Sequence, residues 1–156
     1  MNTLVVYFSR SGHTRQMARE IAQKCGADLE EICEQDARAG VLGYWRSGWQ
    51  VLTRAEPPVL PTTRDPAAYD TVVIGTPIWI SHPAPPVRTW VKRNAPSFKN
   101  VAFFCTEGGS GDRNAFAELS QLCGKTPVAT LAVTEKQLPI DKHAKRLNQF
   151  AIELAI

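Results

Sequence analysis

The sequence predicts an α/β protein built on a doubly wound, five-stranded parallel sheet. Apolar runs of strand length alternate with segments of helical periodicity along all 156 residues. Strands that are apolar on both faces are typical of parallel sheets with helices on each side. Right-handed crossovers with short connections favour an open sheet. No repeat or linker interrupts this alternation, so we expect a single domain spanning residues 1–156.

Five segments have the composition of strands. Four of them are almost continuous in apolar or β-branched residues. The second alternates weakly with acidic residues and therefore predicts only a short strand. In chain order the expected strands are Thr3–Phe8, Leu29–Cys33, Thr71–Gly75, Val101–Cys105 and Val128–Val133.

The helices that separate and follow these strands have recognisable ends. The first stops at Gly26, a glycine in the position of a left-handed cap. The second starts at Pro85-Pro86, because proline is tolerated in a first turn. The third has Asp112 as its N-cap and stops at Gly124, and the last begins near Asp141. Their expected apolar faces are Met17, Ala18, Ile21, Ala22 and Cys25; Val87, Trp90 and Val91; Phe116, Leu119 and Leu122; and Leu147, Phe150, Ile152 and Leu154.

The segment from Glu34 to Pro66 is the irregular part of the chain. Its first half has approximate helical spacing, and its prolines favour an extended connection to the third strand. Three aromatic residues, Tyr44, Trp45 and Trp49, lie close together here. They fit a helix that presses its aromatic face on the sheet. They also fit a wall or lid over a ligand, or a dimer surface, where aromatic residues are enriched.

Composition narrows the classes of function. The net charge is +3 with interspersed charges, which is a weak footprint for nucleic-acid binding. No apolar run reaches the roughly 18 residues of a membrane span, and the chain enters a strand without a signal peptide, so we expect a cytoplasmic protein. The cysteines form no C-x-x-C pair and lack metal-ligand spacing, which predicts structural thiols and no metal site: Cys25, Cys33, Cys105 and Cys123.

A hydroxyl-rich segment, Ser9-Arg10-Ser11-Gly12-His13-Thr14, joins the first strand to the first helix. A helix N-terminus offers unpaired N–H groups and a partial positive charge, so it suits an anion such as a phosphate. The nucleotide triphosphatase loop is excluded because His13 rather than lysine follows Gly12, and the dinucleotide fingerprint is excluded because Gly12 stands alone. Taken by itself, the segment is also compatible with an ordinary serine-capped turn.

Two further loops follow the third and fourth strands and should meet the first at one edge of the sheet. Thr76–Pro85 contains an apolar Ile78-Trp79-Ile80, whose indole either offers a flat face to a planar ligand or folds back on the core. Thr106–Asp112 contains three glycines, which either bring the backbone close to a ligand or make a flexible loop.

These three loops, in this order and spacing, resemble the flavodoxin-like family over almost all of the chain. The resemblance implies FMN as cofactor and the strand order 2-1-3-4-5. It implies that Ser9, Arg10, Ser11, Gly12, His13 and Thr14 hold the phosphate, that Pro77, Ile78 and Trp79 flank the isoalloxazine, and that Thr106, Glu107, Gly108 and Gly109 line its polar edge. It assigns no catalytic residue in this chain.

The chain departs from electron-carrier flavodoxins in charge and in two loops. Carriers of this family are usually strongly acidic, whereas this chain is weakly basic. Thr106–Asp112 has no aromatic residue to cover a second ring face, and Ile78–His82 has no glycine. We therefore expect an oxidoreductase that takes electrons from NAD(P)H or a reductase and passes them to a small acceptor such as a quinone. The alternatives are a non-enzymatic electron carrier and a flavodoxin-like fold that binds no flavin.

Polar residues near these loops have ordinary as well as functional interpretations. Arg10, Arg88 or Arg113 could attract an anionic nicotinamide nucleotide, although surface arginines are usually only solvated. His82 could donate to a substrate or to the flavin, or be a capping or solvated histidine, because no residue nearby in sequence pairs with it. Both a monomer and a homodimer are compatible with the sequence.

Overall fold

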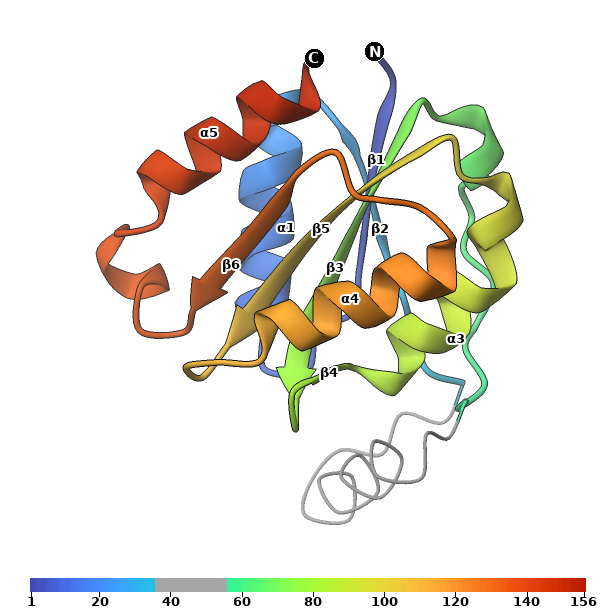
Figure 1. Ribbon diagram of the computed structural model, residues 1–156, viewed down its shortest axis with the longest axis horizontal. Coiled ribbons are helices and arrows are strands. Elements are labelled where there is room, and N and C mark those ends of the chain that lie inside the picture. Colours follow the sequence, from blue (N-terminus) through green and yellow to red (C-terminus); the bar gives the residue numbers. More distant parts are fainter. Residues whose placement is uncertain (36–55) are drawn as a thin grey trace.

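The structure is a computed structural model that describes residues 1–35 and 56–156 (Figure 1). Its parallel sheet has the order β2-β1-β3-β5-β6, which confirms the order 2-1-3-4-5 of the five expected strands. A short strand, β4 (His82–Pro83), pairs antiparallel with the end of β3. The parallel strands are β1 (Thr3–Tyr7), β2 (Asp28–Glu31), β3 (Thr71–Trp79), β5 (Asn100–Glu107) and β6 (Thr130–Thr134).

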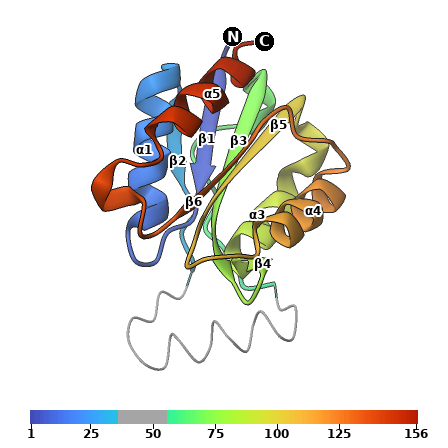
Figure 2. The same ribbon diagram turned by 60° about the vertical axis from the view of Figure 1, so that its left-hand side comes forward.

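Helices cover both faces of this sheet, as the sequence predicts. One face carries α1 (His13–Cys25) and α5 (Ala144–Leu154), and the other carries α3 (Pro85–Asn94) and α4 (Asp112–Cys123) (Figures 1 and 2). The caps at Gly26 and Gly124 are left-handed, with φ of 62° at both. Short 3-10 turns complete the connections: η1 (Pro66–Ala68), η2 (Ala95–Ser97) and η3 (Leu138–Ile140).

Alternate residues of β1, β3 and β5 contribute to two separate hydrophobic cores. Leu4 and Val6 of β1 belong to the cluster that includes Trp90 of α3, whereas Val5 belongs to the cluster that includes Met17 of α1. This division follows from the twofold side-chain period of a strand with both faces buried. A strand in the middle of the sheet must consequently be apolar throughout, and such a strand can be recognised in the sequence as a continuous apolar run.

Several boundaries differ from those expected. Strand β2 begins and ends earlier than Leu29–Cys33, and its four residues are only half-buried because it is an edge strand. Helix α5 begins at Ala144 rather than near Asp141, which is left-handed with φ of 53°. Ile152, expected in the apolar face of α5, is exposed. Gly111, not Asp112, is the N-cap of α4.

The edge of β2 is covered by polar contacts from the segment that leads to β3. Glu30 accepts hydrogen bonds from the backbone N–H and the hydroxyl of Thr63, both at 2.9 Å. Asp28 accepts one from the hydroxyl of Tyr69 at 2.7 Å. An uncovered strand edge can pair with another chain. The acidic residues of β2 therefore have a structural role, because they hold the segment that leads to β3 beside this edge.

The aromatic residues Tyr44, Trp45 and Trp49 lie outside the described residues. In the part of the chain that the structure describes, no helix combines the length and the apolar character needed to cross a membrane.

Candidate functional site

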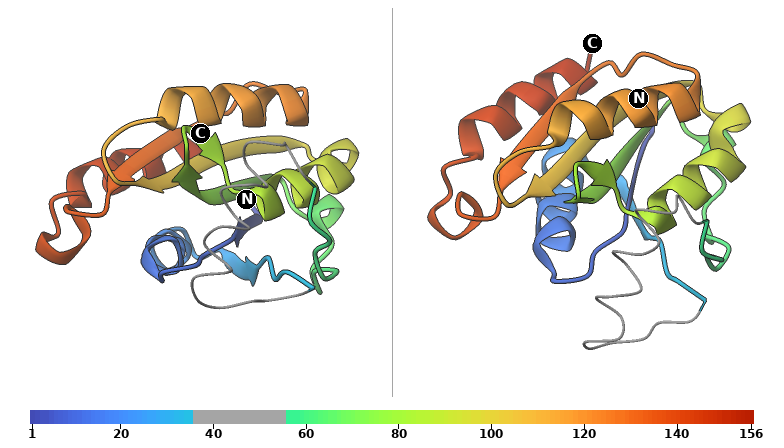
Figure 3. Two further views of the ribbon diagram at one scale, coloured as in Figure 1. Left: turned by 90° about the horizontal axis from the view of Figure 1, so that it is seen from below. Right: turned by 60° about the horizontal axis from the view of Figure 1, so that its bottom comes forward.

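The three loops that the sequence singles out lie at the carboxyl ends of β1, β3 and β5 (Figure 3). Side-chain contacts connect them. The Thr14 and Thr106 hydroxyls, from the first and third loops, lie 2.7 Å apart. The Arg10 guanidinium lies 5.0 Å from the centre of the Trp79 ring, which joins the first and second. Asn114 at the start of α4 donates to the carbonyl of Ser81 at 2.7 Å, which joins the third to the second.

The first loop presents backbone donors at the start of α1. Gly12 is the N-cap in the left-handed region, at φ of 99°, and supplies no side-chain cap. The first N–H groups of a helix have no acceptor within the helix. Ser9 accepts a hydrogen bond from the Gly12 N–H at 3.1 Å, so its hydroxyl hydrogen stays available to a ligand. The loop therefore fits an anion, as the helix dipole also favours.

Basic side chains surround this loop, and some are already paired. His13 Nδ1 lies 3.0 Å from the Ser11 hydroxyl and 3.4 Å from a carboxylate oxygen of Glu135, beyond β6. Arg15, one turn into α1, donates to Glu31 of β2 at 2.6 Å. The ion pair with Glu31 directs the Arg15 charge toward β2. The His13 imidazole, by contrast, lies beside the loop.

The second loop is a β-hairpin rather than the irregular loop expected over Thr76–Pro85. Strand β3 continues to Trp79, and residues Ile78 and Trp79 pair with Pro83 and His82. Proline at 77 is tolerated because it lies near the end of the strand, beyond the pairing of β3 with β1. The two residues of the turn, Ile80 and Ser81, both have positive φ, at 50° and 61°. Such values are unusual for a β-branched residue.

Trp79 lies between the hydrophobic core and the first loop. The indole is partly buried and packs against the α3-side core, with its ring edge-on to Phe8 at 5.7 Å. It also carries the Arg10 guanidinium over its ring. A cation over an aromatic face is attracted by the ring quadrupole. This face is therefore one on which a planar, electron-poor ligand could stack in place of Arg10.

The third loop begins later than expected, because Thr106 and Glu107 are still part of β5 and are buried. A Cβ atom at Gly108 or Gly109 would meet nothing within 4 Å, so these two residues border open space. At Gly111, by contrast, a Cβ would lie 2.8 Å from Ile78 Cγ2 and 2.9 Å from Ser81 Cα, and φ is 114°. Gly111 therefore allows the third loop to pack directly on the hairpin.

Glu107 is a buried carboxyl group at the end of β5. It accepts a hydrogen bond from the backbone N–H of Asp112, whereas its Oε2 has no hydrogen-bond partner in the described structure. Burial, followed by the nearby Asp112 carboxylate, raises the pKa of Glu107 above its usual range. A protonated Glu107 would be a hydrogen-bond donor beside the third loop, in addition to an acceptor.

The raised pKa of Glu107 predicts a stability effect with a definite sign. The unfolded chain loses the proton first as pH rises, so the ionised carboxyl destabilises the folded state progressively from about pH 4 until its raised pKa is passed. Glu107→Gln keeps an oxygen for the Asp112 N–H and cannot ionise. We expect its urea-unfolding free energy to fall less than that of the wild type between about pH 4 and pH 8.

Asp70 provides a control of opposite sign. The backbone N–H of Asn2 donates to its carboxylate at 2.9 Å and lowers the pKa of Asp70. Its stabilising contribution is present at neutral pH and is lost as pH falls through the lowered pKa, so Asp70→Asn should destabilise the protein near neutrality. If the unfolding free energies of Glu107→Gln and the wild type varied identically with pH, the raised pKa of Glu107 would be contradicted.

Sequence reasoning missed one cluster beside the hairpin. His82 Nδ1 lies 2.8 Å from Glu118 Oε2, and Arg88 Nη1 donates to Glu118 Oε1 at 3.4 Å. Arg88 is therefore buried and paired rather than a solvated surface arginine, and the partly exposed His82 has a partner that is distant in sequence. The only sequence signal was a glutamate on a half-apolar helix, which is too common to be informative.

The cysteines behave as the sequence predicts in part. All four are free thiols, and burial raises the pKa of Cys105 strongly and that of Cys123 to about 12. These two are packing residues rather than nucleophiles. Cys25 is half-buried, and Cys33 is exposed.

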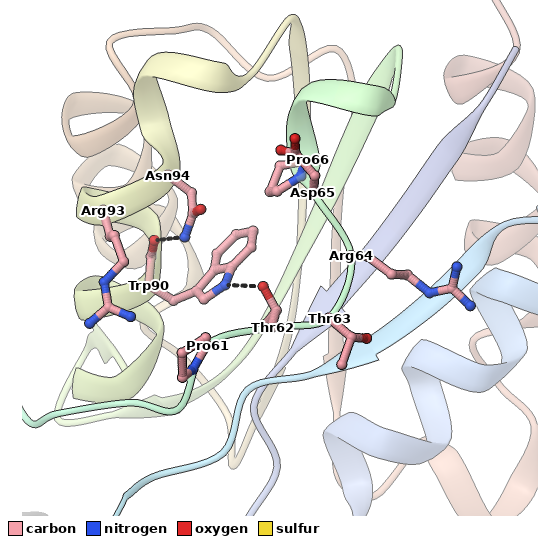
Figure 4. A pocket seen from close by; sticks show the side chains of 9 residues that line it. All are labelled: Pro61, Thr62, Thr63, Arg64, Asp65, Pro66, Trp90, Arg93 and Asn94. Carbon is pink, nitrogen blue, oxygen red and sulfur yellow. Dashed lines mark hydrogen bonds between the residues drawn. The ribbon is translucent and has the colours of Figure 1, made fainter.

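Two hollows in the described chain lie away from the three loops. One, of about 320 Å³, lies between the segment Pro61–Pro66 and α3 (Figure 4). There the Trp90 indole N–H donates to the Thr62 hydroxyl at 3.2 Å, and the Asn94 amide donates to the Trp90 carbonyl. The other, of about 350 Å³, lies between the chain's beginning, the end of α1 and the end of α5. Neither hollow includes a residue of the expected cofactor site.

Comparisons with known proteins agree with the fold. The chain is similar to a flavoprotein from Lactobacillus acidophilus determined in complex with FMN, at 23% identity and a TM-score of 0.74, with 90% of this chain and 97% of that chain covered. It is also similar to a candidate flavoprotein from Bacteroides eggerthii, at 23% identity and a TM-score of 0.79, with coverage of 96% and 98%. An archaeal flavodoxin matches at 20% identity and a TM-score of 0.60, with coverage of 99% and 96%.

Likenesses at these identities show the fold alone, and a comparison with curated proteins gives no match. The family is shown by a different comparison. A family model described as Flavodoxin matches residues 2–138, which is most of the chain and includes all three loops. The order of the strands agrees with the order that the resemblance implies. This chain therefore belongs to the flavodoxin family.

Proposed function

We propose that this protein binds FMN at the three converging loops and passes electrons to a small acceptor such as a quinone, with NAD(P)H or a reductase as donor. The observation that carries the proposal is the set of contacts among the loops. The N-terminus of α1, which has no side-chain cap, lies near the Trp79 ring. Gly108 and Gly109 of the third loop border open space. A phosphate donor set beside a flat ring fits a mononucleotide with a planar base.

The residues present fit such a group chemically. Ser9, Arg10, Ser11, Gly12, His13 and Thr14 would hold the phosphate; Pro77, Ile78 and Trp79 would flank the ring; and Thr106, Glu107, Gly108 and Gly109 would line its polar edge. When bound, FMN supplies the capacity to accept and release one or two electrons. The protein's part is to bind it, orient it and control access to it.

Different residues of this chain would bind the phosphate, stack on the ring and contact its polar edge. The Ser9 hydroxyl and the first N–H groups of α1 would bind the phosphate as neutral hydrogen-bond donors. A ring that stacks on the indole where Arg10 now lies would displace that guanidinium toward the rim. The polar Glu107, buried behind Gly108 and Gly109, would face the edge rather than the faces of the ring.

Two features support an acceptor that reaches the ring directly. The third loop, Thr106–Asp112, contains no aromatic residue that could cover a second ring face. The net charge of the chain is +3, whereas electron carriers of this type are acidic and so attract basic partners. Both features distinguish this chain from a carrier that exchanges electrons only with another protein.

We expect FMN added to the purified protein to remain bound after desalting and to quench part of the tryptophan fluorescence, because Trp79 adjoins the expected ring site. Anaerobic photoreduction followed by mixing with a water-soluble 1,4-benzoquinone should reoxidise the protein in one rapid two-electron phase. A stable blue one-electron form that does not react with the quinone would instead indicate the electron carrier. A protein that retains no FMN would contradict both functions.

A further inference from the structure

His82, Glu118 and Arg88 form a polar relay from three elements beside the hairpin. Glu118 of α4 accepts from Arg88 of α3 with one carboxylate oxygen and lies 2.8 Å from Nδ1 of His82 in β4 with the other. The Arg88 side chain is 7% exposed, Glu118 is 21% exposed and His82 is 28% exposed. The relay thus runs from the protein interior to a partly exposed imidazole.

This arrangement fixes the orientation of the His82 imidazole and determines which of its two nitrogens keeps a proton. A carboxylate at Nδ1 keeps a proton on that nitrogen, as in other histidines held by a carboxylate. Nε2 is then the nitrogen on the far side of the ring, and it has no hydrogen-bond partner among the residues that the structure describes. Arg88 and Glu118 carry opposite charges, so a proton on His82 would add a positive charge beside an ion pair.

The hairpin carries this imidazole to the expected ring site. His82 is the direct cross-strand partner of Trp79. Directly paired residues in an antiparallel pair have Cβ atoms about 4.5–5.5 Å apart. The two left-handed residues between them, Ile80 and Ser81, make the tight turn that this pairing requires, and Asn114 of α4 holds the turn at the Ser81 carbonyl.

We propose that His82, oriented by Glu118 and Arg88, binds the carbonyl oxygen of a quinone acceptor and donates a proton to it. The inference rests on the proposed function, whose acceptor it specifies: a carbonyl compound that takes up protons with its electrons. A proton on Nε2 of His82 would be a donor for the oxyanion that develops on the quinone, and donors aimed at developing negative charge are effective in partly buried sites.

The reduction balances with one proton from the relay. Conversion of a quinone to its hydroquinone consumes two electrons and two protons. Bound FMN would supply both electrons and one proton, and His82 Nε2 would supply the second proton. The O–H bond forms as the Nε2–H bond breaks, which leaves a neutral imidazole with its remaining proton toward Glu118. Water then reprotonates Nε2.

The test compares two acceptors in the FMN-loaded protein. His82→Asn retains an amide donor for Glu118 but lacks Nε2 and cannot titrate. We expect reoxidation of photoreduced His82→Asn by 1,4-benzoquinone to be slower than wild type by about 100-fold, within the range of general-acid catalysis. Hexacyanoferrate(III) takes up one electron and no proton, so its reaction with the variant should keep the wild-type rate.

Two further readouts separate proton donation from a structural role. The quinone rate of the wild type should depend on pH more steeply than that of His82→Asn, because only the wild type carries a proton donor at this position. Glu118→Gln, which keeps a side chain of the same shape but removes the carboxylate that orients the imidazole, should slow the quinone reaction and leave the rate with hexacyanoferrate(III) unchanged. In the oxidised FMN-loaded protein, added hydroquinone should shift the ¹⁵N resonance of His82 Nε2.

Each contrary outcome has a distinct meaning. Equal quinone rates for wild type and His82→Asn at every pH would overturn the role of His82 and leave the proposed function intact. A loss of rate with both acceptors, or no shift of Nε2 at saturating hydroquinone, would also overturn it. A wild-type protein that retains FMN but reduces no quinone would instead contradict the proposed function.

Discussion

Replacing Gly75 with alanine should destabilise this protein by about 3 kcal/mol or more, because the new methyl group has no room. Gly75 lies in the middle of β3, between Tyr7 of β1 and Phe104 of β5 in the register of the sheet. An ideal Cβ at this position would lie 2.0 Å from Cζ of Phe104 and within 2.7 Å of both Cε atoms. Phe104 is fully buried, so its ring cannot rotate into solvent.

A double-mutant cycle distinguishes this clash from a general effect of losing glycine. Phe104→Leu removes the ring that occupies the position of the new methyl group. We therefore expect Gly75→Ala to cost at least about 1 kcal/mol less in the Phe104→Leu background than in the wild type, measured by urea unfolding. Equal costs in the two backgrounds would show that the Phe104 ring yields and that the packing is not the reason for glycine here.

Gly75 also illustrates which parts of the fold could be predicted from sequence. Strands buried on both faces are apolar throughout, so Thr71–Gly75 and Val101–Cys105 were recognisable without knowing what packs on them. The continuation of β3 to Trp79 was not, because the hairpin turn uses Ile80 and Ser81 instead of the glycine or asparagine that usually marks positive φ. Packing against Gly111 and Asn114 imposes that turn.

The candidate site, like the fold, could be predicted from sequence only in part. The position of the three loops follows from strand order, since carboxyl ends of parallel strands share one edge. The relay of His82, Arg88 and Glu118 could not be predicted, because Glu118 lies 36 residues from His82 and 30 from Arg88. Local sequence reports the helix or strand that carries a polar residue, whereas its partner depends on how those elements pack.

The hydroxyl pair formed by Thr14 and Thr106 gives the largest expected effect on FMN binding. Their oxygens lie 2.7 Å apart, 92 residues apart in sequence, and both residues are buried. One hydroxyl donates to the other, so the pair has a single remaining hydrogen to offer to a phosphate. Thr14→Val should weaken FMN binding by about 10- to 150-fold, the range for a hydrogen bond to a charged group.

Stability should respond to the same substitutions in a different pattern. Thr14→Val alone leaves the buried Thr106 hydroxyl without its partner and should cost about 1–3 kcal/mol, as should Thr106→Val alone. In Thr14→Val/Thr106→Val both partners become apolar groups of similar shape, which can be nearly neutral. We therefore expect the double variant to regain most of the wild-type unfolding free energy while its FMN affinity stays low.

Titration with FMN and urea unfolding of the three variants together separate the two roles of the pair. A structural bond alone would restore affinity and stability together in the double variant, since nothing polar would then be left unpaired. A role in phosphate binding alone would leave the stability of every variant unchanged. Ser9→Ala is a useful comparison, because its hydroxyl accepts from the Gly12 N–H within the same loop. Its loss should weaken FMN binding without the compensation that the buried pair permits.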